Sequence, residues 1–265
     1  MIFGQILPEE VLRQLTSGSP WTKVVCLDTT DSTNCRAMEL ASSGAPHGTV
    51  VVADEQTGGR GRRGRHWISP PGRNVYVSLI VRPAIPNAKA VGLSLAAGVA
   101  LADAAESVGV AAFLKWPNDL YLNSRKAAGI LVETASEGDV LKYAVVGVGI
   151  NVNLSGDEIP EELRGKATSF AICAGHSFSR EEILARFLNA FGGRYAEFVA
   201  GGFSAIRSDW ARRDMLRDRR VLIRRGGEEV WAVVRGVSDD GALRFCPDGA
   251  PADETAHSGE ILCFS

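Results

Sequence analysis

The sequence predicts an α+β fold in which a mixed β-sheet with flanking helices is followed by a small module of short strands. Apolar β-branched runs and long helical segments share the first 217 residues, which is typical of helices packed on a sheet. From residue 218 onward the pattern changes to short strands separated by glycine-containing turns. With 265 residues the chain has room for both units. We therefore expect one domain at residues 1–217 and a second at residues 218–265.

Strands are predicted from β-branched and apolar runs bounded by turn residues. In the first unit these runs cover residues 21–27, 49–53, 74–82, 111–115, 120–122, 126–133 and 143–153. In the second unit they cover residues 221–225, 229–237, 242–246 and 260–264. The last four runs indicate a small β-barrel.

Helices are predicted from capping residues and from apolar periodicity. The expected helices are 8–15, one that follows the capping run 28–34 and ends near 42, 88–109, one that opens at the capping box 179–182, and 203–216. The fourth helix carries a core stripe of Ile183, Phe187, Phe191 and Tyr195. The window 88–110 is interrupted by charged residues, so we interpret it as a buried helix and not as a membrane span.

The composition is that of an ordinary globular protein, with 45% hydrophobic residues, 23% charged residues and a net charge of -2. This balance argues against a dedicated nucleic-acid binder, which would carry a broad basic face. The five cysteines are odd in number and contain no CxxC pair, so we expect reduced thiols and no zinc site. The first residues contain no uninterrupted apolar stretch of the signal-peptide kind, and we expect a cytoplasmic protein.

The most informative segment is GGRGRRGRHW at residues 58–67. Glycine leaves backbone N–H groups accessible, and arginine presents a charged planar fork that suits phosphate and carboxylate. Because four like charges repel each other, we expect this loop to be poorly ordered until an anionic ligand supplies the counter-charge. The loop belongs to a strand-to-strand connection of about twenty residues, and connections of that length are usually functional or disordered. The segment alone is equally compatible with a basic patch that binds RNA.

Other polar residues are expected at strand ends and loops of the same sheet. They are Ser32, Thr33, Gln56, Lys115, Asn118, Asp119, Lys126 and Asn151. Cations and amides exceed carboxylates in this set, which favours the binding and polarising of phosphoryl or carboxylate groups. The sequence has no GxxxxGK[ST] phosphate loop. Gly147 and Gly149 interrupt a predicted strand, where either a bound ligand or a β-bulge explains them.

Several blocks, in order and spacing, resemble the biotin protein ligase family. They are GRGRRGRHW (59–67), KWPND (115–119), KAAGILVE (126–133) and GVGINVN (147–153), extended by DSTN (31–34), ATS (167–169) and GEI (259–261). The resemblance implies a catalytic core similar to class II aminoacyl-tRNA synthetases, followed by an SH3-like barrel. It further implies an ATP-dependent, AMP-forming ligase that makes biotinyl-5'-AMP and then transfers biotin to a lysine of a biotin carboxyl carrier domain.

The resemblance also assigns roles to residues. The catalytic residues would be Lys126, Arg62 and Asp119, although Asp119 is equally well explained as a turn residue. The biotin site would comprise Ser32, Thr33, Asn34, Gln56, Gly59, Arg60, Arg62, Lys126, Gly129, Gly147 and Gly149. The ATP site would comprise Arg62, Arg65, Trp67, Lys115, Asn118, Lys126 and Asn151. ATP would bind with Mg²⁺, and no metal ligand is assigned to the chain.

Members of the family that act as repressors carry an N-terminal winged helix-turn-helix, and the sequence shows no counterpart of it, so we expect no DNA binding. The carrier of acetyl-CoA carboxylase is the first candidate acceptor. Family members include monomers and dimers, so a homodimer is compatible with the resemblance. Two alternatives stay open at this point: a lipoate or octanoate ligase or transferase of the same fold, and the RNA-binding module.

Overall fold

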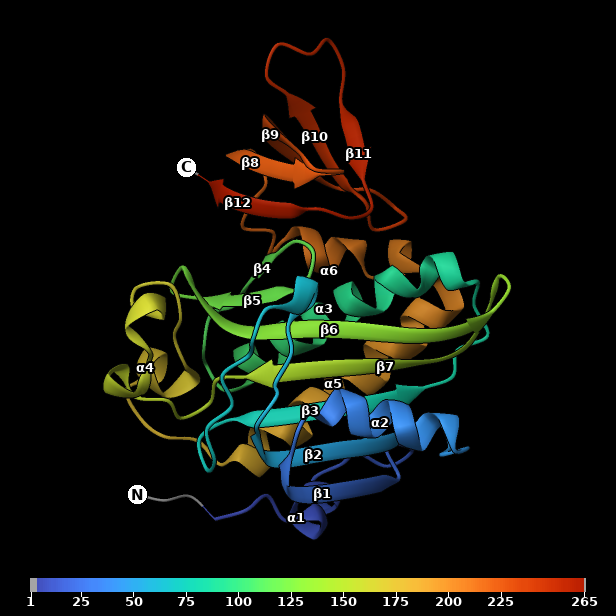
Figure 1. Ribbon diagram of the computed structural model, residues 1–265, viewed down its shortest axis with the longest axis vertical. Helices are drawn as coiled ribbons and strands as arrows, with labels where there is room; N and C mark the ends of the chain where they lie inside the picture. The colour runs from blue at the N-terminus through green and yellow to red at the C-terminus, as the bar shows by residue number, and fades with distance from the viewer. Residues whose placement is uncertain (1–3, 265) are drawn as a thin grey trace.

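The computed structural model describes residues 4–264, and it contains two β-sheets joined by a short connection (Figure 1). The larger sheet has seven strands in the order β1-β2-β3-β7-β6-β5-β4. Its strands are β1 (Lys23–Thr30), β2 (Thr49–Gln56), β3 (Val75–Val81), β4 (Phe113–Lys115), β5 (Asp119–Leu122), β6 (Arg125–Glu137) and β7 (Val140–Ile150). Strands β1 and β2 pair in parallel and the other neighbours pair antiparallel, so the predicted mixed sheet is confirmed.

Helices cover both faces of the larger sheet. They are α1 (Pro8–Arg13), α2 (Thr33–Ser42), α3 (Val91–Ser107), α4 (Phe170–Ala174), α5 (Arg180–Gly201) and α6 (Arg207–Ala211). Helix α2 packs on one face through Ala37 and Ala41, while α3 and α5 lie together on the opposite face (Figure 1). The sheet is therefore enclosed on one side, and the face that carries α2 is left partly open.

Helix α3 is the centre of the core. It is long and apolar enough to cross a membrane by composition, but 72% of its apolar window is buried inside the fold, as the sequence predicted. Gly92 lets α5 approach closely, because a Cβ atom at this position would lie 2.4 Å from the Phe198 ring. The predicted stripe on α5 is confirmed, since Ile183, Phe187 and Phe191 are fully buried. The N-terminus of α5 shows one of the two hydrogen bonds of the predicted capping box: the Ser179 hydroxyl accepts from the Glu182 N–H.

The predicted helix at residues 203–216 is wrong in its extent. A 3₁₀ turn, Phe203–Ala205, and α6 occupy its first part, and the helix ends at Ala211. Beyond that point the backbone pairs with β4: the Leu114 N–H donates to the Arg213 carbonyl, and the Met215 N–H donates to the Leu114 carbonyl. Tertiary pairing thus replaces the local helical bonds.

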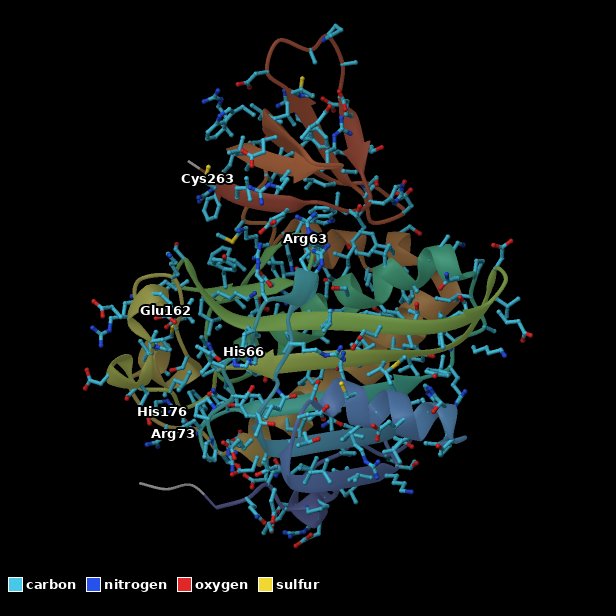
Figure 2. The ribbon with its side chains drawn as sticks, in the orientation of Figure 1. Arg63, His66, Arg73, Glu162, His176 and Cys263 are labelled. Carbon is cyan, nitrogen blue, oxygen red and sulfur yellow. The ribbon has the colours of Figure 1, made fainter. Side chains whose placement is uncertain are left out.

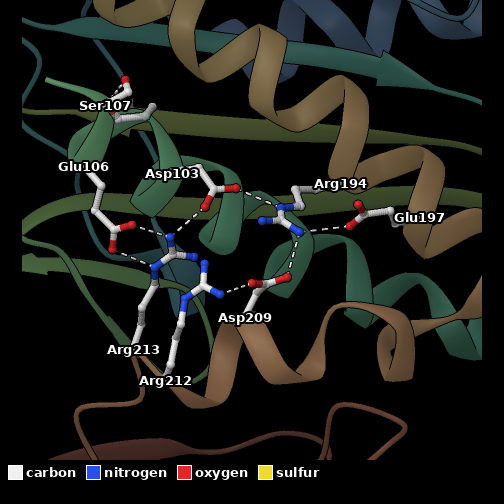
Figure 3. A network of polar contacts seen from close by, with 9 residues as sticks. Asp103, Glu106, Ser107, Arg194, Glu197, Asp209, Arg212 and Arg213 are labelled. Carbon is white, nitrogen blue, oxygen red and sulfur yellow. Dashed lines mark hydrogen bonds and ion pairs between the residues drawn. The ribbon is translucent and has the colours of Figure 1, made fainter.

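A partly buried ion network holds this segment against the helices (Figure 3). Arg213 is 4% exposed, and its guanidinium contacts the carboxylates of Asp103 at 2.7 Å and Glu106 at 2.5 Å on α3. Arg194 on α5 contacts Asp103 at 2.8 Å and Asp209 on α6 at 2.7 Å. Because each cation is shared between elements, the network fixes α3, α5 and α6 together just before the chain enters the second sheet.

The smaller sheet has five antiparallel strands in the order β11-β10-β9-β8-β12. They are β8 (Arg220–Arg225), β9 (Glu228–Val237), β10 (Leu243–Pro247), β11 (Glu254–Ala256) and β12 (Glu260–Phe264). The sequence did not predict β11, which has only three residues. The strand order is compatible with an SH3-like module, but within residues 4–264 no pairing between β11 and β12 closes a barrel.

The smaller sheet is seated at the β4–β5 end of the larger one (Figure 1). The Lys115 ammonium donates to the Ile261 carbonyl at 3.3 Å, and the Trp116 indole N–H donates to the Gly241 carbonyl at 3.2 Å. Trp116 is 2% exposed, so this indole lies in a shared core and not on a loose surface. Strand β12 is thereby held beside the polar strand ends of the larger sheet.

Asp214, at the junction of the two sheets, predicts a pH-dependent stability. Its Oδ2 atom is buried without a hydrogen-bond donor among the described residues, and burial raises the pKa of this carboxyl from 3.8 to about 6. The folded state therefore holds the proton more tightly than the unfolded chain, and the free energy of unfolding falls as pH rises between about 4 and about 6. We expect Asp214→Asn to remove this fall, which amounts to at most about 3 kcal/mol. Urea unfolding at pH 4.5 and pH 7.5 measures it.

The matched control is Asp239→Asn, which changes a carboxylate just after β9 whose side chain is 74% exposed. It should keep the pH dependence of the wild-type protein. Equal pH dependence in the wild-type protein and Asp214→Asn would show that the buried carboxyl does not titrate as described.

Candidate functional site

A cavity of about 350 Å³ opens on the α2-bearing face of the larger sheet, at the N-terminal end of that helix. Its lining includes every predicted site residue except Gly59, although these residues come from segments spread over the chain. Gly59 lies just behind the wall, where a Cβ atom would come within 2.4 Å of the Trp67 carbonyl oxygen. A glycine is needed here because the two ends of the loop, at Gly59 and Trp67, pass close to each other, and no ligand contact is required to explain it.

The floor of the cavity is a row of glycines on adjacent strands. Asp119 is paired with Gly129, and Gly129 is paired with Gly149, so all three lie on the same face of the sheet. A Cβ atom at Gly149 would lie 2.4 Å from the Trp67 indole nitrogen, and one at Gly147 would lie 1.8 Å from the Asn34 amide oxygen. The pairing of β7 with β3 and β6 is continuous at both glycines, which excludes the β-bulge alternative. The glycines are there because side chains lie directly on the backbone.

A bulge does occur one strand away, and it turns Lys126 toward the cavity. The pairing of β5 with β6 shifts between Leu120 and Tyr121, so that Ala127 is an extra residue on β6. As a result Lys126 and Gly129 share a face, and the Lys126 ammonium lies 2.7 Å from the Asp119 carboxylate. The same ammonium lies 5.4 Å from the centre of the Trp67 ring. Lys126 is thus held between one anion and one aromatic face.

The polar wall at the α2 end is a continuous chain of hydrogen bonds. The Gln56 amide oxygen accepts from the Thr33 N–H at 2.9 Å and from the Thr33 hydroxyl at 3.1 Å. The Gln56 amide donates to the Ser69 hydroxyl, which donates to the Trp67 carbonyl. On the other side, the Ser78 hydroxyl contacts Thr33 at 2.8 Å and Asn34 at 2.6 Å. These buried groups satisfy each other and are therefore held in fixed orientations.

The arginine-rich loop folds across the cavity, and three of its four arginines are paired with carboxylates of the protein. Arg60 contacts the Glu133 carboxylate at 3.2 Å, and Arg62 donates to the Asn118 amide oxygen at 3.2 Å. Arg63 contacts the Glu260 carboxylate at 2.8 Å, and Arg65 contacts the same carboxylate. Figure 2 shows Arg63 at the boundary between the two sheets. Two glutamates thus supply part of the counter-charge that we expected from a ligand alone, while ordering on binding stays a prediction.

Both ends of the loop are anchored in the larger sheet. At its return, Arg180 on α5 is 2% exposed and contacts the Asp54 carboxylate at 2.7 Å. The same carboxylate accepts from the Gly72 N–H at 3.2 Å, and Arg180 also donates to the Asn74 carbonyl. A buried cation with several acceptors is costly to disturb, so the base of the loop is rigid even where its tip is exposed.

The cavity is strongly cationic. Seven lysine or arginine side chains line it against three carboxylates, which are Asp119, Glu158 and Glu260. Burial lowers the pKa of the Lys115 ammonium, which lies over the rings of Tyr121 and Phe264 at 5.6 and 5.2 Å. Burial also lowers the pKa of the Arg62 guanidinium, but arginine stays charged at neutral pH. Such a site favours a ligand with several negative charges.

Two of the predicted residues already use their side-chain amides in hydrogen bonds within the protein. The Asn151 amide donates to the Thr168 carbonyl at 3.0 Å, and the Asn34 amide donates to the Leu131 carbonyl and the Glu133 carboxylate. By contrast the Trp67 indole N–H is buried and has no acceptor among the residues that the structure describes. A buried donor of this kind is unfavourable unless a ligand pairs with it.

Sequence reasoning missed part of the wall. The segment after β7 contributes the apolar side chains of Leu154, Ile159 and Leu163, and β12 contributes Glu260. The apolar residues give no signal because they look like ordinary core positions. Glu133 and Glu260 stood inside quoted motifs without a role. Within residues 4–264 no cluster of three or more His, Cys, Asp or Glu side chains is arranged to hold a metal ion.

Known proteins resemble this chain in sequence and in fold. A family model described as the biotin/lipoate A/B protein ligase family matches residues 26–151. A biotin–[acetyl-CoA-carboxylase] ligase of Paracoccus denitrificans is 39% identical, with 81% of this chain and 90% of the relative covered. That of Mycobacterium tuberculosis is 32% identical, with 97% and 95% covered. The solved biotin protein ligase of Aquifex aeolicus in complex with biotin and ATP superposes with a TM-score of 0.78 at 28% identity, covering 92% of this chain and 99% of that one.

The glycine floor predicts the effect of adding a single methyl group. Gly149→Ala should push the Trp67 indole out of the cavity, because the new Cβ atom would lie 2.4 Å from its nitrogen. Acrylamide quenching that is due to Trp67, measured as the difference between each protein and its Trp67→Phe version, should increase. Gly193→Ala on α5 is the control, since a Cβ atom there meets nothing within 4 Å. Unchanged quenching in Gly149→Ala would contradict the described contact.

Proposed function

The chain belongs to the biotin protein ligase family, and we propose that its cavity makes biotinyl-5'-AMP and passes the biotinyl group to a lysine of a carrier domain. The chain is an ATP-dependent, AMP-forming ligase, and its acceptor is the biotin carboxyl carrier protein or domain of a carboxylase. One observation carries the residue-level proposal: a single cavity joins a neutral hydrogen-bonding wall to a cluster of cations, with Lys126 at the meeting point.

In the first step a carboxylate oxygen of biotin attacks the α-phosphorus of ATP. The new O–P bond gives the mixed anhydride, and the bond to the β-phosphate oxygen breaks to release pyrophosphate. Two anions must approach each other, so cations at the meeting point lower the barrier. Lys126 and Arg62 are the groups we assign to this work. The ion pair with Asp119 supports the assignment, because it holds the Lys126 ammonium in one position before the substrates arrive.

The neutral wall suits the ureido ring of biotin, which has both N–H donors and a carbonyl acceptor. Ser32, Thr33 and Gln56 supply hydroxyl and amide groups at the deep end, and Ser32 and Thr33 are 3% and 4% exposed. Asn34 supports the same wall from behind, since its amide is already engaged. Arg60 closes the rim above it. The glycines at positions 129, 147 and 149 let the Trp67 ring and the Asn34 amide lie directly on the sheet, and these two side chains bound the space for the chain that connects the ureido ring to the carboxylate.

The cations near β12 suit the phosphates of ATP. We assign Arg62, Arg65, Lys115 and Asn118 to phosphate contacts, with Trp67 and Asn151 on the adenosine side. The unpaired Trp67 N–H supports a ligand at that position. Mg²⁺ would arrive bound to the ATP phosphates: the carboxylates that line the cavity are already paired with arginine or lysine, so no protein cage is left for the ion.

In the second step the amine of the acceptor lysine attacks the carbonyl carbon of the anhydride and displaces AMP. An ordinary lysine is mostly protonated at neutral pH, so the attacking amine must lose a proton. We assign the orientation of this amine to Asp119, which becomes available once Lys126 contacts the new phosphate ester.

We further propose that residues 1–217 form the catalytic unit and residues 218–265 an SH3-like unit that completes its wall. Glu260 supports this division, because it reaches from β12 to Arg63 and Arg65 of the loop. The carrier of acetyl-CoA carboxylase is the acceptor we expect, and the cytoplasm is the expected compartment. The absence of DNA binding stays a prediction from the sequence, and a homodimer stays compatible with the resemblance.

The cavity also separates the alternatives. A lipoate or octanoate enzyme needs a long apolar channel, whereas the deep end here is lined by the hydroxyl and amide groups of Ser32, Thr33 and Gln56. An RNA-binding surface would present its arginines outward, whereas Arg60, Arg63 and Arg65 are paired with glutamates at the rim.

In the decisive experiment the purified protein is incubated with biotin, ATP and Mg²⁺, and an apo carrier domain is then added. Mass spectrometry detects the products of both steps. We expect biotinyl-adenylate, pyrophosphate and a biotinylated lysine in the wild-type protein. Lys126→Ala should lower the rate of pyrophosphate release by at least about a hundredfold, because it removes the cation at the reacting centre. Lys142→Ala on β7, where the side chain is 52% exposed, is the control and should react normally.

Neither adenylate nor labelled carrier in the wild-type protein would overturn the ligase proposal. Normal pyrophosphate release by a folded Lys126→Ala variant would overturn only the role of that lysine. Lipoate and octanoate in place of biotin test the first alternative in the same assay.

A further inference from the structure

Glu133 is a carboxylate that stands directly behind the cavity and has no place in the mechanism above. It lies on β6, four residues after Gly129, and does not itself line the cavity. Its carboxylate contacts two residues that do line it, Asn34 on α2 and Arg60 on the loop. One anion therefore connects the α2 wall, the sheet and the arginine-rich loop.

The contact with Asn34 is short and sheltered. The Asn34 amide nitrogen donates to Glu133 Oε2 at 2.8 Å, and the Asn34 side chain is almost wholly inaccessible, with 4% exposed. Hydrogen bonds to a charged acceptor are about twice as strong as neutral ones. The bond holds the amide flat over Gly147, where its oxygen accepts from the Ser78 hydroxyl. Ser78 in turn contacts Thr33, so Glu133 is the charged end of the chain that orients the wall.

The contact with Arg60 reaches the other side of the cavity. Nη2 of Arg60 lies 3.2 and 3.3 Å from the two Glu133 oxygens, with the Arg60 side chain 45% exposed. The Nε and Nη1 donors of Arg60 have no acceptor within residues 4–264 and stay available for a ligand. This pair is exposed to solvent and contributes little to stability, but it selects where the guanidinium lies.

We propose that Glu133 is a positioning residue for biotin: it orients the Asn34 side of the wall and fixes Arg60 across the rim in one arrangement. The inference rests on the proposed function, since it concerns the site in which biotin and its adenylate are held. Without Glu133 the wall and the rim are no longer coupled, so biotin binds less tightly and the adenylate escapes sooner. The reacting groups near Lys126 are unaffected, so the chemical step at saturating biotin keeps its rate.

Two substitutions separate the two contacts. Glu133→Gln keeps an oxygen that can accept from Asn34 but removes the charge that attracts Arg60, whereas Glu133→Ala removes both contacts. The matched control is Glu137→Gln, on the same strand, where the carboxylate is 79% exposed and pairs with Lys142 at the surface. Thermal unfolding shows which variants are folded, and the nearly isosteric Gln variant keeps the test valid if the Ala variant is unstable.

Three quantities are measured: the Kd of biotin by isothermal titration calorimetry without ATP, the release rate of preformed biotinyl-adenylate in a chase with unlabelled biotin, and kcat at saturating biotin. We expect Glu133→Ala to raise the biotin Kd by about tenfold, which corresponds to one charge-assisted hydrogen bond. Glu133→Gln should mainly accelerate adenylate release, by about three- to fivefold, because the rim opens while the wall keeps its bond. The kcat of both should stay within about twofold of wild type, and Glu137→Gln should match wild type throughout.

A double-mutant cycle with Arg60→Ala tests the path of the effect. In the Arg60→Ala background, Glu133→Gln should no longer accelerate adenylate release, because the residue on which it acts is gone. A full, additive effect in that background would overturn the role of Glu133 at the rim. Wild-type Kd and release rates in both Glu133 variants, measured beside a wild-type protein that binds biotin and forms adenylate, would overturn the inference alone. A wild-type protein that does neither would overturn the proposed function, and this inference with it.

Discussion

The repulsion between like charges around one cavity is the constraint on which the rest of the site depends. Seven cationic side chains line a space of about 350 Å³, and without compensation they would push the arginine-rich loop into solvent. The protein compensates them with carboxylates that come from different elements: Glu133 on β6 for Arg60, Asp119 on β5 for Lys126, and Glu260 on β12 for Arg63 and Arg65. Each ion pair neutralises a cation and also holds its side chain in one position.

The carboxylates compensate only part of this positive charge. Among residues 4–264, the Arg62 side chain contacts the neutral amide of Asn118, and the Lys115 side chain contacts the carbonyl of Ile261 and two aromatic rings. Neither cation is paired with a carboxylate among the described residues, so its charge is available to a ligand while its position is fixed. A preorganised charge of this kind stabilises a developing phosphoryl transition state without a cost for reorienting groups during the reaction.

The two sheets depend on each other through the same charges. Glu260 and the Ile261 carbonyl belong to the smaller sheet, yet their contacts lie at the mouth of the larger one. The network of Arg194 and Arg213 fixes the chain just before it crosses, and the indole of Trp116 closes the junction (Figure 3). The smaller sheet therefore supplies part of the wall of the site as well as a cover for the end of the core.

The sequence by itself determined the element types and pointed to the segments that surround the cavity. Mixed strands and helices, the buried helix α3, the α5 stripe and the short strands after residue 218 follow from periodicity and turn chemistry, which are local properties. Every site residue that the motifs predicted, except Gly59, lines the cavity. Local patterns also misled where tertiary pairing is stronger, as in the segment after Ala211, which pairs with β4 instead of continuing as a helix.

Only the tertiary structure decided which charges face each other. Glu133 and Glu260 are ordinary acidic residues in the sequence, and their roles arise because β6 and β12 bring them to arginines that lie 73 and 197 residues away. At Gly147 and Gly149 the sequence left a ligand and a bulge as explanations, whereas the structure places side chains of α2 and of the loop, Asn34 and Trp67, directly on these glycines. Coulombic and steric contacts act through space, so their partners cannot be read from spacing along the chain.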